Sequence, residues 1–209
     1  MRRVLDMPSD LRALALTCSL KPSPDPSSSE SLARQVLDEL TGHGVRGESL
    51  RVVDHRVSPG VAVDMGQGDE WPVLREKLLA ADILVLATPT WVGHMSSVAQ
   101  RVLERINAEL SETDDEGRPS MYGKVAVIAV VGNEDGAHKI VADCVQALND
   151  CGFTIPATGS TYWNSEAMNP KDYIDLDRTP EPVAATTATV ARNAVHLARL
   201  LRERQYPRP

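Results

Sequence analysis

The sequence predicts an α/β protein in which one parallel β-sheet is covered by helices on both faces. Short apolar runs alternate with amphipathic segments along the chain, and this alternation is the pattern from which parallel sheets are built. Two of the runs, ILVLATPT and KVAVIAVVG, are apolar at nearly every position, as strands buried on both faces are. We expect residues 1–209 to form a single domain, with its core in 11–163 and an irregular segment and a helix in 164–209.

The first strand is expected at residues 11–20, because LRALALTCSL is apolar and ends at a turn. A helix is expected at 29–40, where one face carries the apolar residues Leu32, Val36, Leu37 and Leu40. Ser29 is the expected N-cap of this helix, and Gly42 and Gly44 are expected to end it.

The middle of the chain continues the alternation. SLRVVDHRV predicts the second strand at residues 49–57, and the Gly-rich, polar residues 58–70 predict a long loop. A helix is expected at 71–82, because Pro72 is tolerated in the first turn of a helix. ILVLATPT, residues 83–90, is the clearest central strand.

The second half repeats the pattern. The remaining helices and strands are expected, in chain order, as a helix at 96–110, a strand at 124–132, a helix at 136–151, a strand at 153–159 and a helix at 187–204. Each helix is assigned from apolar residues at helical spacing, and each strand from a short apolar run. Residues 164–182 show no period and are expected to be irregular.

Five strands joined through helices suit a flavodoxin-like three-layer sandwich with strand order 2-1-3-4-5. Ligands of such a sheet bind beyond the carboxyl ends of the strands, where the strand order reverses. The loops after the first, third and fourth strands are therefore expected to meet, and these are residues 18–31, 88–96 and 131–138.

Composition argues against several functions. The formal net charge of -7 and the absence of a dense basic run argue against nucleic acid as a partner. No apolar stretch is long enough to cross a bilayer, and Asp6 and Asp10 interrupt the N-terminal segment, so we expect a cytoplasmic protein without a membrane partner. The cysteines Cys18, Cys144 and Cys151 fit no metal-binding spacing and are expected to be free thiols.

The first loop, CSLKPSPDPSSSES, leaves a strand and enters a helix. Its serine hydroxyls, Lys21 and the free N–H groups at the helix start suit a phosphate group. A plain Ser-rich surface loop with an ordinary helix cap is the alternative. Neither a GxGxxG fingerprint nor a P-loop motif is present, so neither of those phosphate-binding motifs is supported.

The second loop, TPTWVGHMSS, combines a flat aromatic ring with a glycine. Gly93 permits close approach of a ligand to the backbone, and Trp91 is either part of a pocket or a core or interface aromatic. His94 is either a hydrogen-bond donor to a ligand or an ordinary surface histidine.

The third loop, VVGNEDGAH, suits backbone amides and Asn133 facing the edge of a heterocycle. It is also a competent turn and helix cap, and both readings stay open. His138 is expected on the helix surface.

These three segments carry a resemblance. ALTCSLKPSPDPSSSESLA, LVLATPTWVGHMSSVAQRVLERI and GKVAVIAVVGNEDGAHKIVADCVQALNDCGFTIPATGSTYW together resemble the NADPH-dependent FMN reductase family of flavodoxin-like proteins, over residues 12–163. The resemblance implies FMN as cofactor, with its phosphate held by Ser19, Lys21, Ser29 and Ser31. It implies that the ring is flanked by Pro89, Thr90, Trp91, Val92, Gly93, His94 and Met95, and that its pyrimidine edge meets Gly132, Asn133 and Gly136.

The chain departs from the family pattern in its first loop. Lys21 stands where the family often has an arginine, so a point charge replaces a bidentate fork, and PSPDP lengthens the loop. The compact cysteine cluster of the iron–sulfur members of the wider group is missing.

The implied function is an FMN-dependent oxidoreductase that passes electrons from NADPH or NADH to flavin, quinone or a similar small-molecule acceptor. No catalytic residue and no metal ligand are nominated. An FMN-binding electron carrier similar to flavodoxin, and a domain that has lost its flavin, are the alternatives. The resemblance also implies a homodimer or homotetramer. Because Trp91 and Trp163 both fall near the predicted site, we further hypothesise that the segment STYWNSEAMNPKDYIDLD covers the pocket of a neighbouring subunit.

Overall fold

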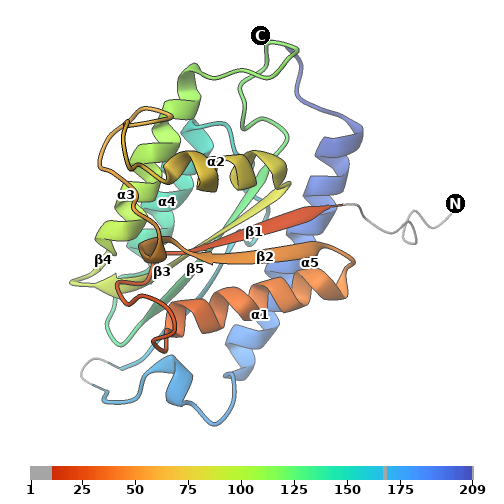
Figure 1. Cartoon of the computed structure of the whole chain (residues 1–209). Helices are drawn as coiled ribbons and strands as arrows, with labels where there is room; N and C mark the ends of the chain where they lie inside the picture. Colours follow the sequence, from red (N-terminus) through yellow and green to blue (C-terminus); the bar gives the residue numbers. More distant parts are fainter. Residues whose placement is uncertain (1–10, 167–168, 209) are drawn as a thin grey trace, which may run out of the picture.

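The computed structural model describes residues 11–166 and 169–208, which form a sheet between two layers of helices (Figure 1). The strands are β1 (Arg12–Thr17), β2 (Arg46–Arg51), β3 (Ile83–Trp91), β4 (His94–Met95), β5 (Val125–Gly132) and β6 (Ser160–Asn164). The α-helices of the described part are α1 (Ser28–Gly42), α2 (Trp71–Ala80), α3 (Ser97–Ile106), α4 (Ala137–Asp150) and α5 (Glu181–Glu203). Short 3₁₀ helices are η1 (Val52–Asp54), η2 (Asn107–Ser111) and η3 (Tyr173–Asp175).

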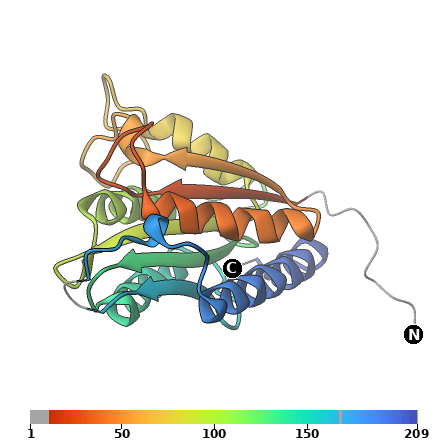
Figure 2. The same cartoon turned by 90° about the horizontal axis from the view of Figure 1, so that it is seen from below.

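The strand order is β2-β1-β3-β5-β6, and every neighbouring pair in this order is parallel. Figure 2 shows these strands side by side. Because β5 and β6 are the fourth and fifth strands of this parallel sheet in chain order, the order confirms the predicted 2-1-3-4-5 arrangement and the flavodoxin-like fold. An additional strand, β4, was not predicted, and its two residues pair antiparallel with the end of β3.

Two hydrophobic cores cover the two faces of the sheet. One core packs α1 and α5 on one face, and the other packs α2, α3 and α4 on the opposite face (Figures 1 and 2). Alternate residues of β5 serve the two cores: Val125, Val127, Ala129 and Val131 face α1 and α5, whereas Ala126, Ile128 and Val130 face the other helices. This alternation is what a strand buried on both faces requires.

The predicted second strand, 49–57, is wrong in its boundaries. β2 begins at Arg46 because this edge strand pairs through its backbone with β1, although its first three residues are exposed and only Arg51 is buried. The ladder ends where Thr17 lies opposite Arg51, and the chain then turns into η1. An apolar run is therefore a poor guide to an edge strand.

The predicted last strand, 153–159, is also wrong. Pro156 has no N–H to donate to a ladder, and Thr154 makes only an isolated bridge to Val125. Regular pairing begins at Ser160, opposite Ile128 of β5.

Several helix boundaries differ from the predictions, and three of the differences have a clear local cause. α1 is capped by Ser27 rather than by Ser29, because the Ser27 Oγ accepts the Glu30 N–H at 3.3 Å. The helix predicted at 96–110 is α-helical only through Ile106 and continues as η2. α5 starts at Glu181, six residues before the predicted position 187, because Pro182 suits the first turn of a helix.

The long loop at residues 58–70 is held by a buried ion pair. Arg105 Nη2 lies 2.8 Å from Asp69 Oδ2, and neither side chain is exposed. Arg105 also donates to two loop carbonyls, those of Ser58 and Ala62. Asp69 accepts from three backbone N–H groups, those of Ser58, Met65 and Trp71. Burial alone would raise the pKa of Asp69, but Arg105 and these N–H groups lower it to about 2.

The three cysteines are free and buried, as predicted. Burial raises the pKa of the Cys18 and Cys151 thiols and raises that of Cys144 to about 12, which keeps them protonated near neutral pH. Among the helices of the described residues, none combines the length and the apolar character that crossing a bilayer would require.

Candidate functional site

The three loops singled out in the sequence lie around one pocket of about 490 Å³ beyond the carboxyl ends of β1, β3 and β5. Its volume falls within the range of small-molecule sites. Residues of all three loops contribute to its lining, and a fourth segment, around η3, completes it.

One end of the pocket is rich in hydroxyl groups. Ser19, Lys21, Ser27, Ser28 and Ser29 line it. Three of these serines belong to the cap and first turn of α1, where backbone N–H groups lack intrahelical partners and the helix dipole favours negative charge. The Lys21 side chain forms no ion pair with any residue in 11–166 or 169–208. This end of the pocket is therefore suited to an anion.

The second loop is a tight hairpin, because β4 folds back on β3 with Trp91 opposite His94. The two turn residues, Val92 and Gly93, have φ angles of 52° and 71°, as a type I′ turn requires. Positive φ strains a β-branched residue, so Val92 is held there by its surroundings. Trp91 is 52% exposed at the rim of the pocket, and Val92 is 85% exposed at the tip.

The hairpin rests on the third loop. The Val92 N–H donates to Glu134 Oε1 at 2.7 Å, across 42 positions of sequence. Gly136 has a φ of 147°, and a β-carbon there would lie 2.9 Å from the Gly93 Cα. The two backbones thus meet at a distance that only glycine permits.

The floor of the pocket is formed by the ends of β3 and β5, which contribute Pro89, Thr90, Val131, Gly132 and Asn133. The Thr90 hydroxyl is buried and has no hydrogen-bond partner among the described residues. A buried hydroxyl left without a partner costs free energy, so a ligand or water at this place would satisfy it.

A small network of buried hydrogen bonds joins the first loop to the second beneath the pocket. The Ser96 Oγ donates to the Cys18 carbonyl at 2.7 Å, and the Ser96 N–H donates to the Thr88 Oγ1 at 3.1 Å. All three residues are buried. These bonds fix the base of the first loop relative to the second.

The fourth segment belongs to the stretch that was expected to cover a neighbouring subunit's pocket. Its place in the pocket of its own chain was not predicted, because residues 164–182 carry no regular pattern. Asp172 and Ile174 line the pocket, and Asp172 Oδ1 accepts a 2.8 Å hydrogen bond from Asn133 Nδ2. The Tyr173 hydroxyl anchors η3 by donating a hydrogen bond to the Gln35 Oε1 of α1 at 2.7 Å. The Tyr173 ring packs on Trp163, with the two ring centroids 5.4 Å apart. The segment thus covers the pocket of its own chain. The predicted contact with a neighbouring subunit's pocket stays a prediction.

The structure brings most of the predicted site residues together. The pocket is lined by Ser19, Lys21, Ser29, Pro89, Thr90, Trp91, Gly132 and Asn133. The predicted residues outside the lining are Ser31, Val92, Gly93, His94, Met95 and Gly136.

Local geometry explains why these six lie outside. Ser31 is in the second turn of α1, where its N–H already donates to the Ser27 carbonyl. His94 is exposed, and its Nδ1 lies 2.7 Å from the Val92 carbonyl oxygen. The remaining four build the hairpin and its contact with the third loop. His138 lies on the surface of α4, as predicted, 2.8 Å from the Tyr162 hydroxyl.

Ser27 and Ser28 also line the pocket, and they belong to the serine run whose hydroxyls were expected to suit a phosphate. The lining residues that were not predicted are Leu20, Pro26, Val131, Glu134, Asp172 and Ile174. No local pattern indicates Glu134 or Asp172, because their roles depend on contacts between distant segments.

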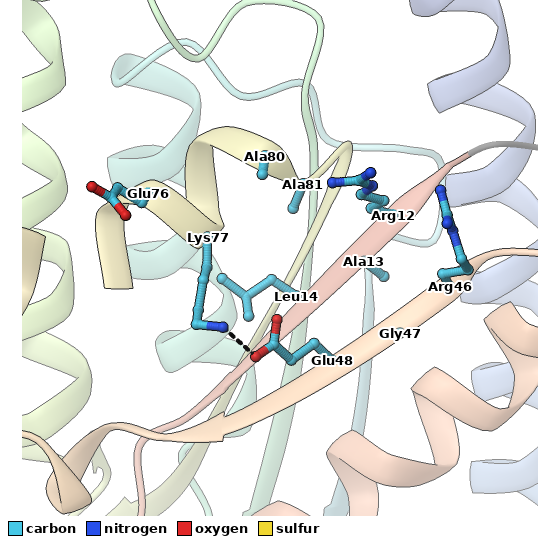
Figure 3. Close-up of a pocket in the computed structure, with 10 residues that line it drawn as sticks. All are labelled: Arg12, Ala13, Leu14, Arg46, Gly47, Glu48, Glu76, Lys77, Ala80 and Ala81. Atoms are coloured by element: carbon cyan, nitrogen blue, oxygen red, sulfur yellow. Dashed lines mark hydrogen bonds and ion pairs between the residues drawn. The ribbon is translucent and has the colours of Figure 1, made fainter. Parts of the chain in front are cut away.

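A second hollow, of about 430 Å³, lies at the opposite end of the sheet, between the start of β1, the edge strand β2 and α2 (Figure 3). Lys77 Nζ is paired with Glu48 Oε1 at 2.6 Å on its wall. Ligands of parallel sheets bind beyond the carboxyl ends of the strands, and Arg12 marks the amino end of β1. The candidate site is therefore the pocket formed by the loops.

Comparison with known proteins gives a consistent result. The family model described as NADPH-dependent FMN reductase matches residues 11–167. An 8-demethyl-8-aminoriboflavin-5'-phosphate synthase from Streptomyces davaonensis is 33% identical over 207 residues, which are 94% of this chain and 80% of that protein. A divalent metal cation transporter, MntH of Mycobacterium bovis, is 35% identical over 206 residues, but the chain spans only 30% of its length.

Solved structures agree on the fold. RosB, solved with the bound intermediate 8-demethyl-8-formylriboflavin-5'-phosphate, superposes with a TM-score of 0.85 and 31% identity, covering 94% of this chain and 82% of RosB. A flavodoxin from the domain Archaea has a TM-score of 0.58 at 8% identity, covering 90% of this chain and 99% of that one, and it supports the fold alone.

Proposed function

The chain belongs to the NADPH-dependent FMN reductase family, and on that basis we propose that it binds FMN and passes electrons from NADPH or NADH to a small-molecule acceptor. The observation that carries this proposal is the pocket itself. Three loops separated in sequence give it one end suited to an anion and another suited to a flat heterocycle.

The hydroxyl-rich end is the proposed phosphate site. First-turn N–H groups of α1, the serines of the first loop and Lys21 combine hydrogen-bond donors with positive charge, which is what a phosphate monoester needs. Lys21 supplies a point charge where the family often has an arginine, so we assign directional hydrogen bonding to the hydroxyl and N–H groups.

The other end is the proposed ring site. Pro89, Trp91 and Val131 offer apolar surface, and Gly132 carries no side chain to obstruct a flat ligand. The Thr90 hydroxyl, which has no partner within residues 11–166 and 169–208, offers a hydrogen bond to the polar edge of the ring. The Asn133 amide nitrogen is already bonded to Asp172, so this pair would meet the ligand as a unit.

When bound, FMN supplies hydride acceptance from a nicotinamide and onward transfer of electrons. The residues of this chain bind, orient and partly enclose it. The two carboxylates at the pocket, Glu134 and Asp172, both accept structural hydrogen bonds, and the chemistry requires neither as an acid or a base. Trp91 at the rim leaves an open side, where a nicotinamide and an acceptor would enter in turn.

The test is the visible spectrum of the purified protein. We expect flavin absorbance at about 450 nm that bleaches on anaerobic addition of NADPH or NADH and returns with an acceptor such as a quinone. Initial velocities at several concentrations of both substrates should give parallel double-reciprocal lines, because one face serves two substrates in turn. A protein that binds FMN but is not reduced by either nicotinamide would instead be an electron carrier.

A second candidate function follows from the relatives. A curated relative named for a modified riboflavin phosphate, and the RosB structure that holds such a compound, each resemble this chain over more than nine-tenths of its length. The alternative proposal is therefore that the flavin is a substrate rather than a retained cofactor. Mass spectrometry of the flavin recovered after prolonged turnover separates the two. Unchanged FMN supports the reductase, and a flavin of altered mass supports modification of the ring.

The expected homodimer or homotetramer remains part of the proposal. Leu20, Trp91 and Val92 are exposed apolar side chains close to the pocket, and a second subunit would cover them. Measurement of the mass in solution tests this expectation, and a monomer would contradict it.

A further inference from the structure

Arg51, the last residue of β2, lies behind the first loop, and its side chain is 3% exposed. Its Nη1 donates to the carbonyls of Lys21, Pro22 and Asp25 at 3.2, 2.7 and 2.8 Å. Its Nη2 donates to the carboxylate of Glu30 in the first turn of α1. One guanidinium thus binds three points of the loop and the start of the following helix.

The prolines of the loop explain why it needs such a partner. Pro22 and Pro26 have no N–H, so the peptide groups before them offer only a carbonyl, and Arg51 satisfies both. Within the loop itself, the Asp25 N–H donates to the Pro22 carbonyl at 3.0 Å and the Lys21 N–H donates to the Ser19 hydroxyl at 3.1 Å. The loop therefore takes much of its shape from a residue outside it.

The same end of β2 supplies a second tie. Asp54 of η1 accepts the Ser23 N–H at 2.8 Å through its Oδ1. Arg51 and Asp54 together hold the loop at its carbonyl groups and at one of its N–H groups. The PSPDP segment that lengthens the loop is therefore an ordered part of the fold rather than an unsupported surface loop.

Arg51 does not act as a phosphate ligand. It is absent from the lining of the pocket, and the carboxylate of Glu30 neutralises its charge. Lys21, by contrast, lines the pocket. Arg51 can therefore influence an anion in the pocket by fixing where Lys21 and the serines lie.

We propose that Arg51 is a positioning residue that shapes the phosphate end of the pocket and so determines the preference for FMN over riboflavin. The inference rests on the proposed function. It predicts an effect on the phosphate-bearing ligand alone, because the ring end of the pocket is built from β3 and β5.

The test compares FMN and riboflavin binding to the full-length apoprotein by fluorescence quenching. In Arg51→Lys, which keeps the charge but loses the fork, we expect FMN affinity to fall about tenfold while riboflavin affinity changes less than about twofold. The matched control is Arg105→Lys, because Arg105 is equally buried, pairs with Asp69 and clamps loop 58–70 away from the pocket. We expect this control to leave the ratio of the two affinities unchanged.

Asp54→Ala provides a second test, because the Asp54 side chain is exposed and its loss should leave the fold intact. We expect FMN affinity to fall about threefold, with riboflavin unaffected. If Arg51→Lys does not fold, this variant decides the question.

Equal losses for FMN and riboflavin in a folded Arg51→Lys, or no loss of FMN affinity, would overturn the inference. A wild-type protein that binds both flavins equally would also overturn it. A wild-type protein that binds neither flavin would instead refute the proposed function, so the two failures are distinguishable.

Discussion

Replacing Gly136 with alanine should force apart the two loops at the outer side of the pocket. A β-carbon at this position would lie 2.9 Å from the Gly93 Cα and 3.0 Å from its carbonyl carbon and oxygen. These are backbone atoms, so no side-chain rotation can relieve the overlap. The Gly136 φ of 147° is an additional strain for any L-residue.

The two penalties can be estimated separately. Overpacking of this kind costs about 1–3 kcal/mol, and a backbone conformation disfavoured for alanine costs about 1–2 kcal/mol. We expect Gly136→Ala to lower the free energy of unfolding by roughly 2–5 kcal/mol, which for a chain of this size is a decrease in Tm of about 4–20 °C.

The glycines of the chain supply matched controls for thermal denaturation of the apoprotein. A β-carbon at Gly42 would have no atom within 4 Å, and the φ of Gly42 is not positive, so Gly42→Ala should be neutral or slightly stabilising. Gly66 has a positive φ in open space, so Gly66→Ala measures the strain alone. Gly132→Ala measures contact alone, because its β-carbon would lie 2.6 Å from the Thr90 Cβ.

Binding of FMN provides the functional readout. Gly132→Ala and Gly136→Ala should both weaken FMN binding, because one narrows the floor and the other displaces the hairpin, whereas Gly42→Ala and Gly66→Ala should not. A Gly136→Ala protein as stable as Gly42→Ala would refute the contact between the two loops, and with it the account of the pocket.

Three further substitutions test separate parts of the structure. Thr90→Val removes a buried hydroxyl that has no partner in the described chain, so the stability of the apoprotein should stay the same or rise. FMN affinity, measured by titration, should fall about threefold to tenfold. Unchanged affinity would show that the hydroxyl does not contact the ligand. Lys21→Met should weaken FMN binding and reduce the dependence of that binding on salt concentration, whereas Lys21→Arg should keep both the affinity and the salt dependence of the wild type. Identical salt dependence in the wild type and the two variants would place the phosphate elsewhere. The pKa of Asp69 is about 2 in the folded protein and 3.8 as its ordinary value, so the unfolded state binds more protons between these values. The contribution of this carboxylate to stability is therefore complete above about pH 4 and is lost as the pH falls toward 2. Asp69→Asn should lower stability at pH 7 by roughly 3 kcal/mol, because Arg105 is left without its buried partner, and should flatten the acid limb of the curve of Tm against pH; an unaltered acid limb would contradict this assignment.

The sequence was a sound guide where a local pattern reports directly on burial. β3 and β5 are apolar on both faces, and both were predicted to within a residue of their boundaries. The edge strand β2 was misplaced because its first three residues are exposed, and its identity as a strand depends on backbone pairing with β1. β6 was misplaced because the apolar residues before it lead to Pro156 rather than into a ladder.

The candidate site divides in the same way. Lining residues within an unbroken serine run or at the end of a central strand, such as Ser29 and Thr90, could be placed from sequence because strand ends converge at one edge of a parallel sheet. His94 could not be placed, because a two-residue turn directs the hairpin and exposes its imidazole to solvent.

Sequence alone thus determined the alternation of strands and helices, the strand order and the three loops at which a ligand would bind, because burial and turn chemistry are written in neighbouring residues. Only the tertiary structure decided that Arg51 shapes the first loop, that Glu134 supports the hairpin and that Asp172 and Ile174 close the pocket. These contacts join residues 29 to 42 positions apart or lie in a segment without a period. A hydrogen bond between such residues forms only once the sheet has brought their loops together, so no pattern of neighbouring residues in the sequence predicts it.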